Sequence, residues 1–182
     1  MRIAPSQTQV AAAFGRIEAS DAVAESASLV REGSQPLEML QAMAAAPDVL
    51  AGFAAMSEGV YPGGSLSRDV QEAVILAASV RNACQFCHQS HIDIAKAVGV
   101  ASDPQAWIDS PATMSQHQKI AVRYTDQMLD DANGVSDGLF AQVHEAFGDA
   151  GSVELTMLVG YINMLNMFNN ALQNRYHGEL GG

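Results

Sequence analysis

The residues of this chain that could do chemistry are concentrated in one short run. Its two cysteines, Cys84 and Cys87, are separated by two residues, and His88 and His91 follow within the next turn. Glu72 lies twelve residues before Cys84, across a stretch that is almost wholly apolar. Thiols, imidazoles and a carboxylate are the groups of thiol redox chemistry, because the thiolate is the reacting form and needs a proton acceptor nearby.

On a helix, these side chains share one face. With Cys84 as the origin and about 100° of rotation per residue, Cys87 falls at about −60°. His91 falls at about −20° and His88 at about +40°, so all four lie within an arc of about 100°. The same stripe continues through apolar residues as far as Val98, which predicts that this face points inward. We therefore expect a partly buried pocket at the start of a helix.

The start of that helix favours a reactive thiol. Asn82 is a plausible N-cap, with Gln85 in the capping-box position. A helix N-terminus and a nearby imidazole favour thiolate over thiol, and two cysteines at this spacing can close a disulfide after one is oxidised to sulfenic acid. His91, four residues after Cys87, is placed to accept a proton, and Glu72 could orient that imidazole or relay its proton.

Each residue also has a structural explanation that the sequence leaves open. Glu72 could be the third residue of a capping box that Asp69 begins. His91 could be a hydrogen-bonded core histidine, and His88 could face solvent or cap a neighbour. The cysteine pair itself could be structural.

Two kinds of metal site compete with thiol chemistry as explanations of this run. The run Cys84-Gln-Phe-Cys87-His88 matches the attachment signature of c-type haem, which would ordinarily require export. A zinc site with two cysteines and two histidines from one eight-residue segment is geometrically awkward, because zinc ligand pairs usually come from two separate knuckles. We expect no metal, and no cofactor other than a redox-active Cys84–Cys87 disulfide.

The composition and periodicity indicate an all-α, single-domain helical bundle. Tyr61-Pro62-Gly63-Gly64 predicts a turn, and a loop over 103–111 carries the only tryptophan, Trp107. Helices are predicted over 8–32, from Pro36, from Pro47, over 67–81, from Asn82 to near Gly99, and over 115–131, 136–147 and 152–174. The helix over 67–81 is apolar nearly all round, so it and the following helix form the central pair.

The charge excludes some partners. Twenty acidic against nine basic residues give a formal charge of −11, whereas nucleic acids and anionic membrane surfaces attract a basic footprint. The N-terminus shows no signal-peptide pattern and no segment approaches the about 20 apolar residues of a membrane span, so we expect a cytoplasmic protein.

Asparagines mark the last predicted helix. Asn163, Asn166, Asn170 and Asn174 form a stripe on it. We interpret this stripe as the polar face of the helix or as a contact between subunits.

The spacing of the reactive residues resembles a known pattern. Glu72, Cys84, Cys87 and His91 stand as they do in the alkylhydroperoxidase D-like families of the carboxymuconolactone decarboxylase superfamily. The run Val-Ile-Leu-Ala-Ala-Ser-Val-Arg-Asn-Ala-Cys-Gln-Phe-Cys is similar to their central helix pair. The likeness is strongest over about 36–100, so we divide the chain into an N-terminal helical extension, 1–35, and an alkylhydroperoxidase D-like domain, 36–182.

The resemblance implies a peroxidase cycle in an all-α protein that assembles into trimers or hexamers. Cys87 would be the peroxidatic thiol and Cys84 the resolving one, with His91 and Glu72 as the proton relay. The implied substrate is an organic hydroperoxide, and an external dithiol or lipoyl-type reductant would reset the disulfide.

One position departs from that pattern. Alkylhydroperoxidase D proteins have a histidine directly before the second cysteine, where this chain has Phe86. His88 points about 100° away from Cys87 and is an imperfect substitute. Two other functions remain open: a lactone decarboxylase-like lyase that uses His91 and Glu72 as acid and base, and a non-catalytic helical assembly module braced by the disulfide.

Overall fold

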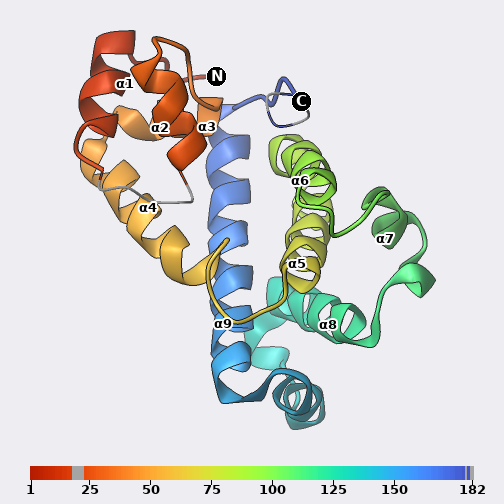
Figure 1. Cartoon of the computed structure of the whole chain (residues 1–182). Helices are drawn as coiled ribbons and strands as arrows, with labels where there is room; N and C mark the ends of the chain where they lie inside the picture. Colours follow the sequence, from red (N-terminus) through yellow and green to blue (C-terminus); the bar gives the residue numbers. More distant parts are fainter. Residues whose placement is uncertain (18–22, 179, 181–182) are drawn as a thin grey trace.

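The computed structural model of the chain describes residues 1–17, 23–178 and 180, and within this part every regular element is a helix. The predicted all-α, single-domain bundle is confirmed (Figure 1). The helices are α1 (Gln7–Phe14), α2 (Ala24–Arg31), α3 (Glu38–Ala44), α4 (Pro47–Val60), α5 (Arg68–Arg81), α6 (Gln85–Ala97), α7 (Gln105–Asp109), α8 (Gln116–Asp131) and α9 (Asp137–Leu172), with short 3-10 turns η1 (Pro111–Thr113) and η2 (Ala132–Gly134).

The centre of the fold is α5, as its apolar sequence predicts. Ala73, Val74 and Leu76 lie on different faces of this helix and are all fully buried. They are covered by α6, α8 and α9, which pack around α5 (Figure 1). Because α5 is enclosed, the one carboxylate in its middle, Glu72, is buried as well.

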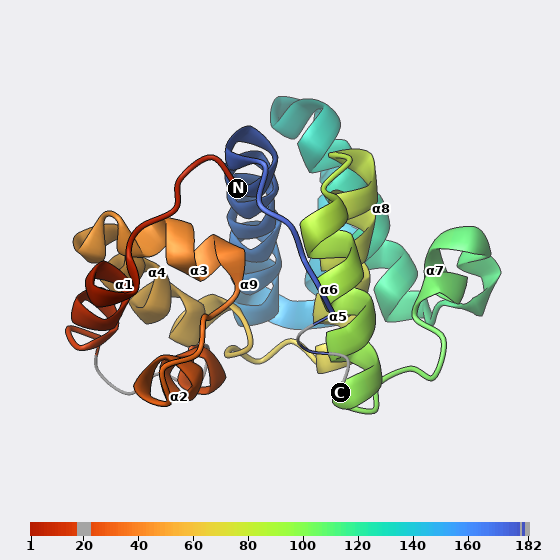
Figure 2. The ribbon, with the colours of Figure 1, turned by 90° about the horizontal axis from the view of Figure 1, so that it is seen from above.

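The N-terminal helices form a second group beside the long helix α9. In Figure 2, α1 to α4 lie on one side of α9 and α5, α6 and α8 on the other. The single helix predicted over 8–32 is wrong, because α1 ends at Phe14 and α2 begins at Ala24. Gly15 ends α1, which fits the low helix propensity of glycine. The part of that prediction over 18–22 lies outside the described residues.

The predicted turn at 61–64 is confirmed and joins the two groups of helices. The Tyr61–Pro62 peptide bond is cis, and Gly64 has a φ of 93° that favours glycine. A Cβ atom at Gly63 would collide with the backbone carbonyl of Glu58, so a larger residue does not fit this turn. The turn places Tyr61 beside α5.

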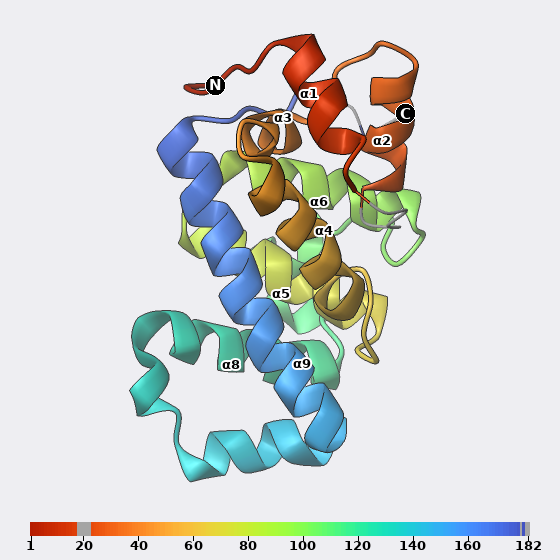
Figure 3. The same ribbon diagram turned by 90° about the vertical axis from the view of Figure 1, so that its left-hand side faces the viewer.

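Two further predictions need correction. The segment 103–111 is not only a loop, because it contains α7, on which Trp107 is buried in a small cluster with Ala73 and Leu76 of α5. The helices predicted over 136–147 and 152–174 are joined in α9 through a kink at Gly148, whose φ of 66° and ψ of −172° are not helical. Figure 3 shows the two parts of α9 meeting at a steep angle.

The helices predicted from Pro47 and over 67–81 and 115–131 are confirmed as α4, α5 and α8. Among the described residues, no helix has the length and apolarity needed to cross a membrane.

Candidate active site

Cys84 begins α6 as its capping residue, which corrects the cap predicted at Asn82. The Cys84 sulfur accepts a hydrogen bond from the backbone N–H of Cys87 at 3.3 Å. Asn82 instead ends α5, and Ala83, with a positive φ of 50°, turns the chain between the two helices. The helix therefore starts later than predicted, and its N-terminal N–H groups point at a sulfur.

The two thiols are free, buried and adjacent. The sulfur atoms of Cys84 and Cys87 lie 2.8 Å apart. The hydrogen bond between the two sulfurs lowers the pKa of Cys84, with help from backbone N–H groups and from the Asn166 side chain. The same hydrogen bond, together with burial, raises the pKa of Cys87. These opposite directions favour negative charge on Cys84 over negative charge on Cys87 in the reduced pair.

Glu72 and His91 form the predicted pair. Oε2 of Glu72 lies 2.7 Å from Nδ1 of His91, and the Glu72 side chain is fully buried. Burial alone would raise the pKa of Glu72, but His91, with Tyr61 and Arg68, lowers it. Nδ1 therefore donates to a carboxylate, and Nε2 is the ring nitrogen left for a molecule in the pocket.

The capping role considered for Glu72 is wrong. Ser67 is the N-cap of α5, so Glu72 lies too far along the helix to belong to a capping box. Its other oxygen, Oε1, accepts a hydrogen bond from the Tyr61 hydroxyl at 2.6 Å and lies 2.8 Å from Nε of Arg68. Both carboxylate oxygens are therefore engaged inside the site.

Tyr61 and Arg68 belong to the site, and the sequence analysis missed both. The Tyr61 hydroxyl accepts a hydrogen bond from Nη2 of Arg68 at 2.7 Å and lies 3.3 Å from Nδ1 of His91. The Arg68 guanidinium also lies over the Tyr61 ring, 4.3 Å from its centre. Burial raises the pKa of Tyr61 well above its usual range, so its hydroxyl keeps its proton. The spacing of Arg68, four residues before Glu72 on a helix, is the signal that could have found the ion pair.

The structure corrects the interpretation of the asparagine stripe on α9 as a polar face or a subunit contact. Asn166 is completely buried, so it lies neither on a polar surface nor at a subunit contact. Asn169, one turn later and 1% exposed, donates its side-chain N–H to Cys87 Sγ at 3.3 Å. Asn174 donates to Oδ1 of Asn169 at 3.0 Å and so fixes the orientation of that amide. Sequence spacing gave no signal that α9 supplies a partner for the thiol.

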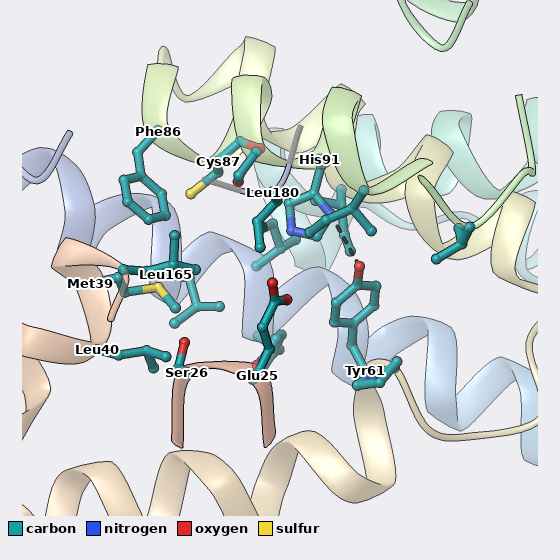
Figure 4. Close-up of a pocket in the computed structure, with 18 of the residues that line it drawn as sticks. Glu25, Ser26, Met39, Leu40, Tyr61, Phe86, Cys87, His91, Leu165 and Leu180 are labelled. Atoms are coloured by element: carbon teal, nitrogen blue, oxygen red, sulfur yellow. Dashed lines mark hydrogen bonds between the residues drawn. The ribbon is translucent and has the colours of Figure 1, made fainter. Parts of the chain in front are cut away.

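A cavity of about 560 Å³ opens beside this network. Cys87 and His91 line it, whereas Cys84, His88 and Glu72 do not. Most of its wall is apolar, contributed by residues such as Met39, Leu40 and Leu165 (Figure 4). A ligand in this cavity would therefore meet the Cys87 thiol, the His91 imidazole and a mostly apolar wall that also carries the Glu25 carboxylate.

The structure separates His88 from the reacting groups. It is half-buried, and its Nε2 has no hydrogen-bond partner in the part of the chain that the structure describes. Within that part, no three histidine, cysteine or acidic side chains converge as ligands of a metal ion. Of the five residues singled out from the sequence, the structure brings Glu72 and His91 into one contact pair and Cys84 and Cys87 into another.

Comparison with known proteins confirms the resemblance. Residues 47–107, which include both cysteines, His91, Glu72 and Tyr61, match the model of the carboxymuconolactone decarboxylase family. An uncharacterized protein of Bacillus subtilis (strain 168), YdfG, is 26% identical over 116 residues, which are 61% of this chain and 78% of that protein.

Two solved structures share the fold. An uncharacterized peroxidase-related protein from Silicibacter sp. TM1040 superposes with a TM-score of 0.75 at 19% identity, over 87% of this chain and 85% of its own. A peroxidase-related protein from Ralstonia eutropha JMP134 with an alkylhydroperoxidase AhpD core superposes with a TM-score of 0.71 at 15% identity, over 92% and 90%. The fold is that of alkylhydroperoxidase D-like proteins.

Proposed function

We propose that this chain, which carries a carboxymuconolactone decarboxylase family segment on an alkylhydroperoxidase D-like fold, is a thiol-dependent peroxidase for organic hydroperoxides. The observation that supports this most is the arrangement of the thiols around the cavity. Cys87 lines the cavity, and Cys84 lies directly behind it with 2.8 Å between the sulfur atoms. A peroxide could reach Cys87, and Cys84 could then close a disulfide without a large movement.

The first step needs the negative charge on the sulfur that faces the cavity. In the reduced pair Cys84 holds the thiolate, so the Cys87 proton passes to Cys84 across their hydrogen bond. The Cys87 thiolate attacks the distal oxygen of the hydroperoxide, and the oxygen–oxygen bond breaks. His91 gives a proton to the departing alkoxide, which leaves as an alcohol, and His91 regains a proton from solvent. Cys87 is now a sulfenic acid.

The second step uses the other thiol. The Cys84 sulfur attacks the sulfenic sulfur of Cys87, and the Cys84 proton and the sulfenic hydroxyl leave as water. One disulfide and one alcohol have then been formed per hydroperoxide. An external dithiol, of which a lipoyl group is one example, returns two electrons and two protons through a mixed disulfide.

The lining of the cavity supports an organic rather than an inorganic peroxide. Its volume of about 560 Å³ lies in the range of sites for small organic ligands, and its wall is mostly apolar. Hydrogen peroxide would bury no apolar surface there, whereas an alkyl or aryl group would.

The test is steady-state turnover of cumene hydroperoxide with dithiothreitol as reductant. Cys87→Ser should abolish turnover. Cys84→Ser, treated with the hydroperoxide in the absence of dithiothreitol, should consume one equivalent and retain a sulfenic acid at Cys87. Because the two variants differ from each other only in which sulfur remains, each serves as the folding control of the other. Unchanged turnover in Cys87→Ser would contradict the proposal.

A second candidate is a lactone decarboxylase-like lyase. The observation that favours it is that His91 and Tyr61 line the cavity and are tied to Glu72 without help from either cysteine. Such an enzyme would keep its activity in the cysteine-free double variant Cys84→Ser/Cys87→Ser and lose it in His91→Ala.

A further inference from the structure

The chain beyond α9 crosses the molecule as an irregular strap, which the structure describes over 174–178 and 180. Gln173 ends α9 in the left-handed conformation, with a φ of 55°, and turns the chain away from the helix. Figure 2 shows the strap passing from the end of α9 alongside α6. Because these residues form no helix, their position depends on the side chains that hold them.

The first part of the strap is held by α9 and α3. Asn174 donates its side-chain N–H to Oδ1 of Asn169 on α9 at 3.0 Å. The Glu38 carboxylate at the start of α3 accepts a hydrogen bond from the backbone N–H of Arg175 at 2.8 Å. The same carboxylate lies 3.1 Å from Nε2 of His177. The strap therefore joins the N-terminal group of helices to the end of α9.

Tyr176 anchors the strap to α6. Its ring meets the Phe86 ring edge to face, with 6.1 Å between the ring centres. Its hydroxyl donates to Oδ2 of Asp93 at 2.7 Å and accepts a hydrogen bond from the backbone N–H of Leu180 at 2.9 Å. One side chain thus fixes the strap at two points of α6 and determines where Leu180 lies. Phe86, which replaces the histidine of the alkylhydroperoxidase D pattern, serves here as the surface on which that anchor packs.

This anchor brings an apolar side chain into the cavity. Leu180 lines the cavity together with Cys87 and His91, and it is drawn between them in Figure 4. Leu40 and Leu165, on the same wall, belong to packed helices and are at most 6% exposed. Leu180 is half-buried and belongs to a segment without regular structure. It is therefore a part of the wall that can be altered without repacking the core.

We infer that Leu180 is a specificity-determining residue, which Tyr176 holds in place so that it limits the bulk of the molecules that reach Cys87. The cavity measures about 560 Å³ with this side chain in it, and a leucine beside the thiol leaves room for a slim molecule before a branched one. As a statement about substrates, the inference rests on the proposed peroxidase function. Hydroperoxides of primary, unbranched alkyl chains should then be preferred over tertiary ones.

The experiment measures access to Cys87 without peroxide. In the Cys84→Ser background Cys87 is the only thiol, and its alkylation is followed with N-methylmaleimide and with the bulky N-pyrenylmaleimide. Leu180→Ala should speed the reaction with the bulky reagent by about tenfold or more and leave the small reagent unaffected, because removing methylenes from an apolar pocket changes selectivity on this scale. Leu180→Trp should slow the bulky reagent. Tyr176→Phe keeps the ring on Phe86 but loses the hydroxyl, so it should act in the same direction as Leu180→Ala.

Two matched controls lie away from the cavity. Leu172→Ala changes a half-buried leucine at the end of α9, and Tyr124→Phe removes a hydroxyl that bonds to Thr156. Both should react like the Cys84→Ser protein with both reagents. Equal acceleration of the two reagents in Leu180→Ala would mean altered thiol reactivity, and unchanged rates would mean that Leu180 sets no limit. Either result would overturn the inference.

Turnover separates this inference from the proposed function. With both cysteines intact, Leu180→Ala should raise kcat/KM for cumene hydroperoxide and leave that for ethyl hydroperoxide unchanged. If the maleimides show the expected selectivity but no hydroperoxide is turned over, Leu180 limits access and the proposed peroxidase function is wrong. If hydroperoxides are turned over with the same selectivity in Leu180→Ala as in the unaltered protein, the role of Leu180 in substrate choice is wrong and the peroxidase function stands.

Discussion

Asn169 on α9 donates its side-chain N–H to Cys87 Sγ at 3.3 Å, across 82 residues of sequence. It contacts the proposed peroxidatic thiol from the C-terminal helix, as Asn166 one turn earlier also does. Its amide lowers the pKa of Cys87 against the larger effects of the hydrogen bond to Cys84 and of burial. Because Asn174 holds the amide in place, the donor is available when negative charge moves to Cys87.

Asn169→Leu should therefore slow the reaction of Cys87 with cumene hydroperoxide by at least about tenfold, because losing one hydrogen bond to a charged group costs about 1.5 kcal/mol or more. The rate should recover at higher pH, where the thiolate forms without the donor. Stopped-flow measurement of disulfide formation across pH would show both effects. Asn163→Leu, on the same helix and bonded to Asn82 rather than to a thiol, is the control. An identical pH profile in the two variants would show that Asn169 is only structural.

Glu72→Gln should slow peroxide-driven disulfide formation by about a hundredfold, in the range of general acid–base effects. The amide keeps hydrogen-bonding atoms in place but cannot carry the negative charge that orients His91. Asp69→Asn, three residues earlier on α5, changes a carboxylate outside the site and should leave the rate unchanged. Thermal unfolding distinguishes the roles, because normal kinetics with a large fall in Tm would assign Glu72 to stability alone.

The lowered pKa of Cys84 has a signature in the reduced protein. As the pH is lowered through the usual range of cysteine ionisation, the Cys84 thiolate should persist, and the Cys87 thiol should stay protonated. Ultraviolet thiolate absorbance would record it. Cys87→Ala removes the S–H donor, so the Cys84 midpoint should move to higher pH. If Cys84→Ser retained the low-pH thiolate, the assignment of the charge to Cys84 would be wrong.

The sequence was sufficient for the parts of the site that depend on local helical spacing. Cys87 and His91 lie one turn apart on α6, so the face that they share toward the cavity follows from 3.6 residues per turn. Asn169 could not be found in this way, because its contact depends on how α9 crosses α6. The cap at Asn82 was mispredicted because the left-handed backbone at Ala83 moves the helix start to the next residue.

Elsewhere, periodicity alone was misleading. The apolar pattern over 8–32 continues past Gly15, but the chain turns there and α2 forms separately. Tyr61 gave no signal as a site residue, because its place is determined by the tight turn with Pro62 and Gly63. Its hydroxyl reaches Glu72 only once that turn has brought α4 and α5 together.

One charged side chain on the wall of the cavity should govern which hydroperoxides react. Figure 4 shows the Glu25 carboxylate of α2 directed from below toward the space under His91 and Leu180. A carboxylate there should disfavour anionic substrates, so linoleic acid hydroperoxide should have a lower kcat/KM than its methyl ester. Glu25→Gln should raise kcat/KM for the acid by about fivefold, corresponding to about 1 kcal/mol of charge repulsion near the surface, and leave the ester unchanged. Glu32→Gln, which lies just beyond the same helix and does not line the cavity, is the control. Equal effects on acid and ester would contradict a role in selection.

The most direct measurement is a count of free thiols in the fully reduced protein before and after one equivalent of cumene hydroperoxide. The peroxidase mechanism requires both thiols to disappear rapidly and to return on addition of dithiothreitol. Two thiols that survive the peroxide would contradict the mechanism and favour acid–base chemistry at His91 and Glu72.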